Sequence, residues 1–303
     1  MESLLSSSPP LPTPSGPESD IEVPNDILLL LSDLLHEDRR GHALEMLSRK
    51  RESFSSFAEA LWSSVGVVTV LLHEIISTYH LLVPPTLNSA QSTRVNHALG
   101  LLQVIASHSH TKMLLLEANI HLYLFPFLAT QTQTKPFEYL RLSSLAVIGA
   151  LLKQDLTVVV PTLLKTEVVP LCLRIMDTCQ ITARTVATFT IHRIISDDVG
   201  LKYITSSNDR FASLHKVLRQ NAKILITKRD VRGSKYDESE FQLMRLLLRC
   251  WSKLAENVEV CSFLRDNQLP PELVSGEVVT LFRNDRSVSK YQQILVELLG
   301  PTK

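Results

Sequence analysis

The stretch "KPFEYLRLSSLAVIGALLKQD", residues 135–155, decides the fold. Pro136 predicts the start of a helix, because backbone N–H groups in the first turn have no partner within the helix, so proline loses nothing there by lacking one. Residues 145–152 are all apolar or glycine, and a helix that is apolar all round is buried on several sides. Polar side chains gather at the ends, where Glu138 and Arg141 have the spacing of an ion pair on an exposed entry turn. The stretch predicts a central helix of a larger helical protein.

Segments of the same build recur along the chain, each an apolar helix followed by a polar break and a second helix. Recurrence every 40 to 60 residues or so, without an alternating strand pattern, is typical of armadillo or HEAT arrays, whose repeats bury apolar faces against each other. We therefore predict an all-α, right-handed armadillo-repeat solenoid of about six repeats. An irregular helical domain is the alternative. Gly149 and Ala150 are expected to let neighbouring helices approach closely. The clearest units begin at His97, Ser144, Val186 and Phe241.

Two segments depart from the repeat pattern. Residues 1–24 are rich in proline and serine and lack the apolar mass that would offset chain ordering, so they predict a disordered tail ahead of an armadillo domain at 25–300. Residues 221–240 are polar and of mixed charge, and they predict an insertion loop, either a binding element or simply a solvated turn. No apolar run reaches the roughly 18 residues of a membrane span, so we expect no membrane partner.

The charge is balanced overall and segregated locally. Lys and Arg number 31, as do Asp and Glu, so the whole molecule has no net field to attract an ionic partner. Between residues 183 and 235, however, the sequence has eleven Lys or Arg and only four Asp. Such a region could bind phosphate backbones or acidic peptides, or its side chains could be dispersed around the solenoid.

Motifs of catalysis are missing from the sequence. The "HEIIS" at residues 73–77 lacks the second histidine that a zinc-protease helix needs, and His108 and His110 of "SHSH" read as a solvated turn. No Walker loop, nucleophile elbow or dinucleotide fingerprint occurs. We therefore expect no enzyme activity, no metal and no cofactor. The four cysteines lack metal-ligand spacing and are expected to be buried structural thiols; they are Cys172, Cys179, Cys250 and Cys261.

Several long stretches resemble one family. "KPFEYLRLSSLAVIGALLK", "VPPTLNSAQSTRVNHALGLLQVIASH", "EVVPLCLRIM" and "TVATFTIHRIISDDVGLKYI" are similar to the required-for-cell-differentiation family, the armadillo-repeat subunit of the Ccr-Not mRNA deadenylation complex. The likeness runs from about Ala43 to Leu218 and resumes weakly at "RCWSKLAEN". It implies a non-catalytic adaptor in the cytoplasm and nucleus, acting in mRNA decay, translational repression and gene regulation. The implied partners are the large scaffold subunit and short motifs of RNA-binding or silencing proteins, with nucleic acid and a second copy of the chain left open.

The resemblance also implies site residues. The peptide groove on the concave face would use Tyr139, Ala146 and Val186, where Arg141 and Arg184 would form a basic rim for an amphipathic helix. Simple packing between repeats is the alternative for Ala146 and Val186. The scaffold contact would fall on the helix "WSSVGVVTVLLHEII", at Ser63, Val65, Thr69 and Ile76.

The chain departs from the family at a pocket that holds tryptophan. Asn208 replaces a tyrosine and Glu259 an arginine, while Arg210 is retained; Ala146 stands where glycine is usual and Gln242 where arginine is. Losing an aromatic wall and a cation weakens a pocket that stacks an indole, so we interpret the chain as a diverged paralogue. The alternative function is a nucleic-acid-binding or transcription-linked protein that uses the basic region. Its candidate contacts are Arg184, Arg193 and Arg210.

Overall fold

The computed structural model describes residues 23–50, 56–232, 237–274, 277–282 and 285–299. The tail expected at residues 1–24 therefore lies almost wholly outside the described residues. Within them the chain is built of helices and connecting turns, with no strand. No single helix of this part is long and apolar enough to cross a membrane, although two sharply bent helix pairs match on length and composition; they are Phe57–Ser63 with Val67–Leu81 and Leu156–Leu164 with Val168–Thr178.

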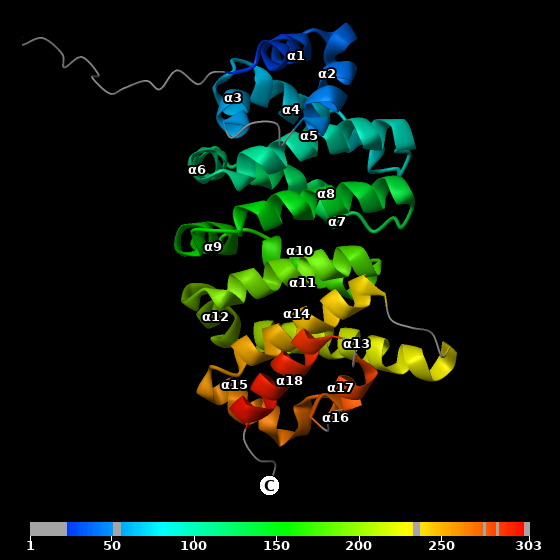
Figure 1. Ribbon diagram of the computed structural model, residues 1–303, viewed down its shortest axis with the longest axis vertical. Coiled ribbons are helices and arrows are strands. Elements are labelled where there is room, and N and C mark those ends of the chain that lie inside the picture. Colours follow the sequence, from blue (N-terminus) through cyan, green and yellow to red (C-terminus); the bar gives the residue numbers. More distant parts are fainter. Residues whose placement is uncertain (1–22, 51–55, 233–236, 275–276, 283–284, 300–303) are drawn as a thin grey trace, which may run out of the picture.

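The helices follow one another in groups, each of which ends in a helix of 13 to 19 residues (Figure 1). The first group has only α1 (Asn25–Leu35) and α2 (Glu37–Arg49). The middle groups are α3 (Phe57–Ser63), α4 (Val67–Ile76) and α5 (Ser89–Ser107); α6 (Ser109–Glu117), α7 (Phe125–Ala129) and α8 (Lys135–Leu151); α9 (Leu156–Leu164), α10 (Val168–Thr178) and α11 (Ile181–Ser196); and α12 (Asp198–Thr205), α13 (Asn208–Arg232) and α14 (Glu238–Leu254). The last has α15 (Val258–Phe263), α16 (Pro271–Val274), α17 (Glu277–Leu281) and α18 (Arg286–Leu299).

The final helices of successive groups stack in one row, which we call the ladder: α2, α5, α8, α11, α14 and α18, each in contact with the next. Figure 1 shows this row running down the length of the molecule, with blue α2 near one end and red α18 near the other. Stacking of this kind lets each repeat bury its apolar faces against its neighbours. The arrangement confirms the predicted helical solenoid.

The helix α8 explains the apolar stretch that predicted it. It lies in the ladder between α5 and α11 and buries Phe137, Leu140 and most of residues 144–151. The space around Gly149 is less restricted than expected, because an added Cβ would lie 3.7 Å from the ring of Phe189, which is an ordinary contact distance. Close helix approach therefore does not require glycine at this position.

The expected ion pair between Glu138 and Arg141 on an exposed entry turn is wrong. Arg141 is only 1% exposed, and its Nη1 donates to the carbonyl oxygen of Thr130 at 3.2 Å and to the hydroxyl of the same residue at 3.0 Å. Thr130 directly follows the last residue of α7, where helix carbonyls have no partner within the helix. Arg141 therefore caps α7 from within the core.

The insertion loop expected at 221–240 is also wrong for residues 221–232, which continue α13. Asn221, Ala222, Leu225 and Ile226 are buried with the spacing of one helical face, and this apolar face is hidden among the polar residues of the sequence. The next helix begins with a capping box, in which Asp237 accepts from the Glu240 amide and the Glu240 carboxylate accepts from the Asp237 amide.

Arginine side chains cap several other helices at their carboxyl ends. Arg193 of α11 donates to the carbonyl oxygens of Leu152 and Lys153, at 2.8 and 2.9 Å, just beyond α8. A cation at a helix carboxyl end satisfies unpaired carbonyls and complements the helix dipole. These side chains therefore fix one helix against another. Further arginine contacts of this kind are Arg40 to Leu34, Arg184 to Cys179, Arg210 to Tyr203, and Arg265 to Leu299.

Candidate functional site

The first candidate surface is an exposed edge of α4. Thr69 and Ile76 are exposed on one face of this helix, together with His73 between them. Val65, in the turn before α4, is 91% exposed, and the turn depends on Gly66, whose φ of 83° lies in the left-handed region that favours glycine. Ser63, the last residue of α3, is exposed as well. The structure therefore places all four predicted scaffold-binding residues at the surface.

A hollow that the sequence did not reveal lies beside this edge. It has a volume of about 390 Å³ and lies between α2 and α4, with Thr69 in its wall. Nearby, α1 exposes Leu28, Leu29 and Leu35, and the Leu35 side chain would lie 3.0 Å from a Cβ at Gly66. Exposed apolar side chains thus extend from α1 to the turn that carries Val65. The hollow is lined by Glu37, Arg40, Thr69, Val70 and His73.

Beneath the edge lies a buried ion network. Glu74 is 4% exposed, and its carboxylate accepts from Nε and Nη2 of Arg94 at 2.5 and 2.7 Å, with Arg40 Nη1 at 3.6 Å. Burial pushes the pKa of Glu74 up, but the hydrogen bond to Arg94 and the charges of both arginines outweigh it, so the pKa is lowered. The network joins α2, α4 and α5.

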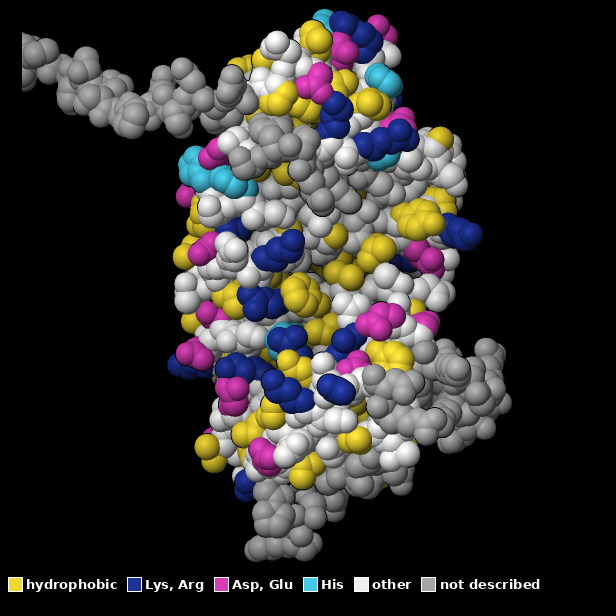
Figure 2. Space-filling model, in the orientation of Figure 1, with side chains coloured by type: hydrophobic (Ala, Val, Ile, Leu, Met, Phe, Trp, Pro, Cys, Tyr) yellow, Lys and Arg dark blue, Asp and Glu magenta, His cyan; other side chains and the backbone are white. Residues whose placement is uncertain are grey.

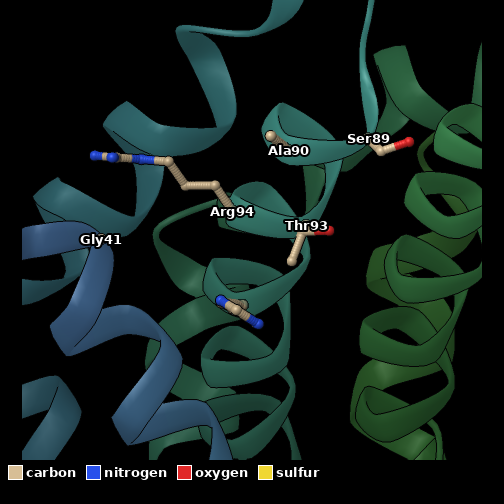
Figure 3. Close-up of a pocket in the computed structure, with 6 residues that line it drawn as sticks. Gly41, Ser89, Ala90, Thr93 and Arg94 are labelled. Atoms are coloured by element: carbon tan, nitrogen blue, oxygen red, sulfur yellow. The ribbon is translucent and has the colours of Figure 1, made fainter.

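Arg94 also borders a second hollow, of about 460 Å³, between α2 and α5. Figure 3 shows Arg94 reaching from α5 toward the side on which α2 carries Gly41. The wall of this hollow is mostly made of small side chains of α5. It is lined by Gly41, Ser89, Ala90, Thr93, Arg94 and His97.

The second candidate surface is the ladder face of α8 and α11. Tyr139 is 55% exposed there, and Ala146 and Val186 are partly exposed. Phe189 on α11 is also partly exposed and lies against α8 near Gly149. Figure 2 shows hydrophobic side chains across the middle of the molecule, with Lys and Arg side chains beside them and below them. The predicted groove residues therefore lie on adjacent helices of the ladder, where an apolar strip crosses from α8 to α11.

Basic side chains continue this strip onto α14 and α18. The Arg249 guanidinium lies over the Tyr291 ring, 5.3 Å from its centroid, and the Lys290 ammonium is 6.0 Å from the same ring. His192 is buried beside these groups, and burial together with the charges of Arg249, Arg193 and Lys253 lowers its pKa to about 4. Sequence analysis missed Arg249 and Lys290 because both lie outside the segment of highest charge.

The basic residues that the sequence did single out have other partners. Arg141 is buried, so the expectation that it forms a groove rim is wrong. The Nε of Arg184 donates to Cys179 O at 2.5 Å, and Arg193 binds the end of α8. Arg210 lies on α13, outside the ladder. The structure therefore does not bring Arg184, Arg193 and Arg210 together on one face.

The predicted pocket residues Asn208, Arg210 and Glu259 are all exposed. Arg210 lies flat on the Tyr203 ring, 4.0 Å from its centroid, and donates to Tyr203 O at 2.8 Å. Nearby aromatic rings pack with each other, since Phe263 meets Phe211 edge-on at 5.3 Å. The retained arginine is thus already stacked on a side chain of its own chain.

Comparison with known proteins assigns the chain to a family. The model of the cell differentiation family, Rcd1-like, matches residues 30–299. The chain belongs to this family. The Rcd1-like chain is 44% identical over 260 residues to cell differentiation protein rcd1 of Schizosaccharomyces pombe, covering 86% of this chain and 88% of that protein. It is 42% identical over 255 residues to protein CAF40 of Saccharomyces cerevisiae, covering 84% of this chain and 66% of that protein.

Solved structures confirm the armadillo fold of the Rcd1-like chain. Designed armadillo repeat protein YIII(Dq)4CqI superposes with a TM-score of 0.63 at 15% identity, covering 90% of this chain and all of the other. Designed armadillo repeat protein YIII(Dq.V1)4CPAF, solved in complex with peptide (KR)4, gives 0.62 at 16% identity, covering 91% and 100%. At these identities the likeness shows the fold alone.

The cysteines of the Rcd1-like chain are free and buried, as expected. Burial raises the pKa of the Cys172 thiol to about 12 and that of the Cys250 thiol further still, so neither thiol is a nucleophile at neutral pH. Within the described ranges, no group of three or more His, Cys, Asp or Glu side chains is placed to hold a metal ion. The described surface carries two candidate sites, the exposed edge of α4 and the ladder face.

Proposed function

We propose that this chain is a non-catalytic adaptor subunit of a Ccr4-Not deadenylase complex, acting in mRNA decay and translational repression in the cytoplasm and nucleus. Membership of the Rcd1-like family and the similarity to CAF40 support the assignment. The observation that carries it is the exposed apolar edge at α4, where Val65 is 91% exposed and Ile76 is 43% exposed. The large scaffold subunit of the complex is the partner proposed for this edge.

The geometry of the edge suits a docking contact. Binding energy at protein interfaces is concentrated in a few apolar anchors that enter hollows. Here Val65 and Ile76 would supply anchors, and the hollow beside Thr69 would accept one from the scaffold. Leu28 and Leu29 on α1 would widen the contact.

The ladder face would recruit the second partner. Tyr139 offers an apolar ring with a hydrogen-bonding tip, and Val186 offers a small apolar floor on the next helix. An amphipathic helix can lie across such a strip with anchors one turn apart. Short motifs of RNA-binding or silencing proteins are the proposed ligands, and they would bring the deadenylase to particular mRNAs.

A pull-down of the purified chain with the armadillo-binding region of the scaffold subunit tests the proposal. Val65→Asp is expected to abolish capture, because the charge would be buried in the contact without a partner. Val258→Asp is the matched control, since Val258 is 80% exposed on α15, far along the chain from α4, and this variant is expected to bind as the wild type does. Failure of the wild-type chain to bind the scaffold, or equal binding by Val65→Asp, would contradict the adaptor assignment.

A second candidate function is nucleic-acid binding. Its specific support is the row of exposed cations on α13, at Lys216, Arg219 and Lys223, which have no ion pair within the described chain. Phosphate contacts release counterions, so binding of a single-stranded RNA should weaken steeply as salt is raised and should be lost in Arg219→Glu/Lys223→Glu. RNA binding that is insensitive to both salt and this variant would remove the second candidate.

A further inference from the structure

The ladder face changes its chemistry along the row of helices. On α8 and α11 it presents Tyr139, Val186 and Phe189. On α14 and α18 the same row presents Arg249, Tyr291 and Lys290 instead. Phe189 and Arg249 lie on helices in direct contact, so the apolar strip passes into the basic end without a break. The two parts form one surface rather than two separate sites.

The register of the helices supports this continuity. Phe189 lies near Gly149 of α8, and Arg193, one turn further along α11, binds the last carbonyls of α8. The side chain of His192, between them in sequence, is close enough to Arg249 and Lys253 of α14 for their charges to act on it. Arg249 in turn lies over Tyr291 of α18. Neighbouring levels of the ladder are therefore linked from α8 to α18.

The charge at the basic end is only partly neutralised. Lys253 pairs with Glu256 at 2.5 Å, and Arg245 lies 3.2 Å from Asp285. Among the described residues, neither Arg249 nor Lys290 makes an ion pair; both instead lie near the face of Tyr291. A cation that rests on an aromatic ring keeps its hydrogen-bond donors available for an anion.

We propose that the ligand of the ladder face is an amphipathic helix that continues into an acidic end, with its apolar side chains on Tyr139, Val186 and Phe189 and its carboxylates on Arg249 and Lys290. This inference rests on the proposed function of the groove and adds the chemistry and the direction of its ligand. Charge complementarity argues for it, because Arg249 and Lys290 lie together at the basic end without an ion pair among the described residues, whereas Arg184 and Arg193 of α11 bind backbone carbonyls and Lys135 lies at the first residue of α8. The acidic end must therefore lie toward α18 and the apolar end toward α8.

The dimensions fit such a ligand. Packed helices lie about 8 to 10 Å apart, so a segment that crosses from α8 through α11 and α14 to α18 spans roughly 24 to 30 Å. A helix of about 16 to 20 residues covers that distance. Arg249 and Lys290 lie on the last two helices of this path, whereas a phosphate backbone, which is charged along its whole length, would also cross the apolar strip on α8 and α11. The surface therefore favours a peptide over a nucleic acid.

The test selects ligands without assuming their sequence. A displayed library of random peptides of about 20 residues, long enough for a helix of roughly 30 Å, is selected on the full chain and on three folded variants. The variants are Val186→Glu in the apolar strip, Arg249→Glu/Lys290→Glu at the basic end, and Lys165→Glu/Arg174→Glu, two exposed positions at the end of α9 and on α10, which changes the net charge equally but lies outside the ladder. Circular dichroism confirms folding, and Lys290→Glu alone replaces the double variant if that variant does not fold.

The wild-type chain and the Lys165→Glu/Arg174→Glu control are expected to select helical apolar patterns that end in Asp and Glu. The basic-end variant is expected to keep the apolar pattern and lose the acidic end. For a selected peptide, fluorescence anisotropy should show about tenfold weaker binding to Arg249→Glu/Lys290→Glu, because two partly exposed charge contacts are lost. The binding should also weaken as salt is raised.

The contrary outcomes distinguish a failure of the acidic-end inference from a failure of the proposed peptide groove. Apolar peptides that depend on Val186 but carry no acidic end would overturn the present inference and leave the groove in place. Selected peptides that are unaffected by Val186→Glu would overturn the groove itself, and the present inference with it. An oligouridine probe that binds the wild-type chain, requires Arg249 and displaces the acidic peptides would assign the basic end to nucleic acid instead.

Discussion

The buried ion network at Glu74 yields the sharpest prediction about stability. Replacing Arg94 with alanine removes both hydrogen bonds to the carboxylate, at 2.5 and 2.7 Å, and leaves a charge that is 4% exposed. Breaking a buried pair by removing one partner typically costs about 3 to 5 kcal/mol. Arg40 remains at 3.6 Å and compensates part of the charge, so we expect a loss near 3 kcal/mol.

Two further variants identify the cause of this loss. Arg94→Lys keeps the charge but cannot donate two parallel hydrogen bonds, so it should be intermediate between the wild type and Arg94→Ala. Glu74→Gln/Arg94→Ala removes the buried charge altogether and should recover part of the loss. The difference between the double variant and the sum of the single variants measures the coupling between the two residues directly.

The pH dependence gives an independent signature. In the wild type the pKa of Glu74 is lowered, so its stabilisation is complete above the unfolded pKa, roughly 4.3, and is lost as the pH falls through the folded pKa. Without Arg94, burial dominates and raises the folded pKa above the unfolded one. Protonation of Glu74 then removes the unpaired buried charge from the variant. The difference in stability between wild type and Arg94→Ala should therefore shrink as the pH is lowered from 7 toward about 4.

Urea denaturation followed by tryptophan fluorescence is a suitable assay. The chain has two tryptophans, Trp62 on α3 and Trp251 on α14, so Trp251→Phe leaves a single reporter near the network. A local reporter is needed because repeat proteins can unfold in parts. A loss below about 1 kcal/mol, or additive single variants, would refute the reasoning, because a surface pair behaves in that way.

Two further predictions concern other parts of the core. The pKa of buried His192 is lowered to about 4, against roughly 6.5 in the unfolded chain. As the pH falls, the unfolded chain therefore binds the proton first, and the stability of the folded chain should fall between about pH 6.5 and 4. In thermal melts across this range, the melting temperature of His192→Gln should change less with pH than that of the wild type. A Cβ at Gly200 would lie 1.9 Å from the carbonyl oxygen of Ile194, so Gly200→Ala should lower the free energy of unfolding by more than about 2 kcal/mol. Gly100→Ala is the matched control, because nothing lies within 4 Å of its added Cβ, and this variant should be neutral or slightly stabilising in the same urea titration.

The sequence predicts the fold well where apolar patterns repeat. The run at residues 145–152 could only be buried, and α8 lies between two ladder helices as that run requires. The prediction is wrong at residues 221–232, because a helix that is polar except for a narrow apolar face has the overall polarity of a loop. Single-sequence reasoning weighs overall polarity there, while the fold uses only the few buried positions, such as Leu225.

The candidate sites are harder to predict because a charged residue carries no sign of its partner. Arg141 and Arg249 look alike in the sequence, yet one is buried as a helix cap and the other lies on a tyrosine at the surface. Glu74 likewise seems an ordinary residue of an amphipathic helix until α2 and α5 bring two arginines to it. Such pairings depend on residues that are distant in sequence, which only the assembled solenoid brings together.

Among the described residues, most arginine caps fix helices within one repeat, and one cap connects two repeats. Arg193 of α11 holds the carbonyls just beyond the carboxyl end of α8, so the step between these two repeats has a fixed length and angle. The α4 edge and the basic end of the ladder lie on opposite sides of this step. Two proteins bound there would be held at a constant separation and orientation, and loosening a single cap would change both without altering either binding surface.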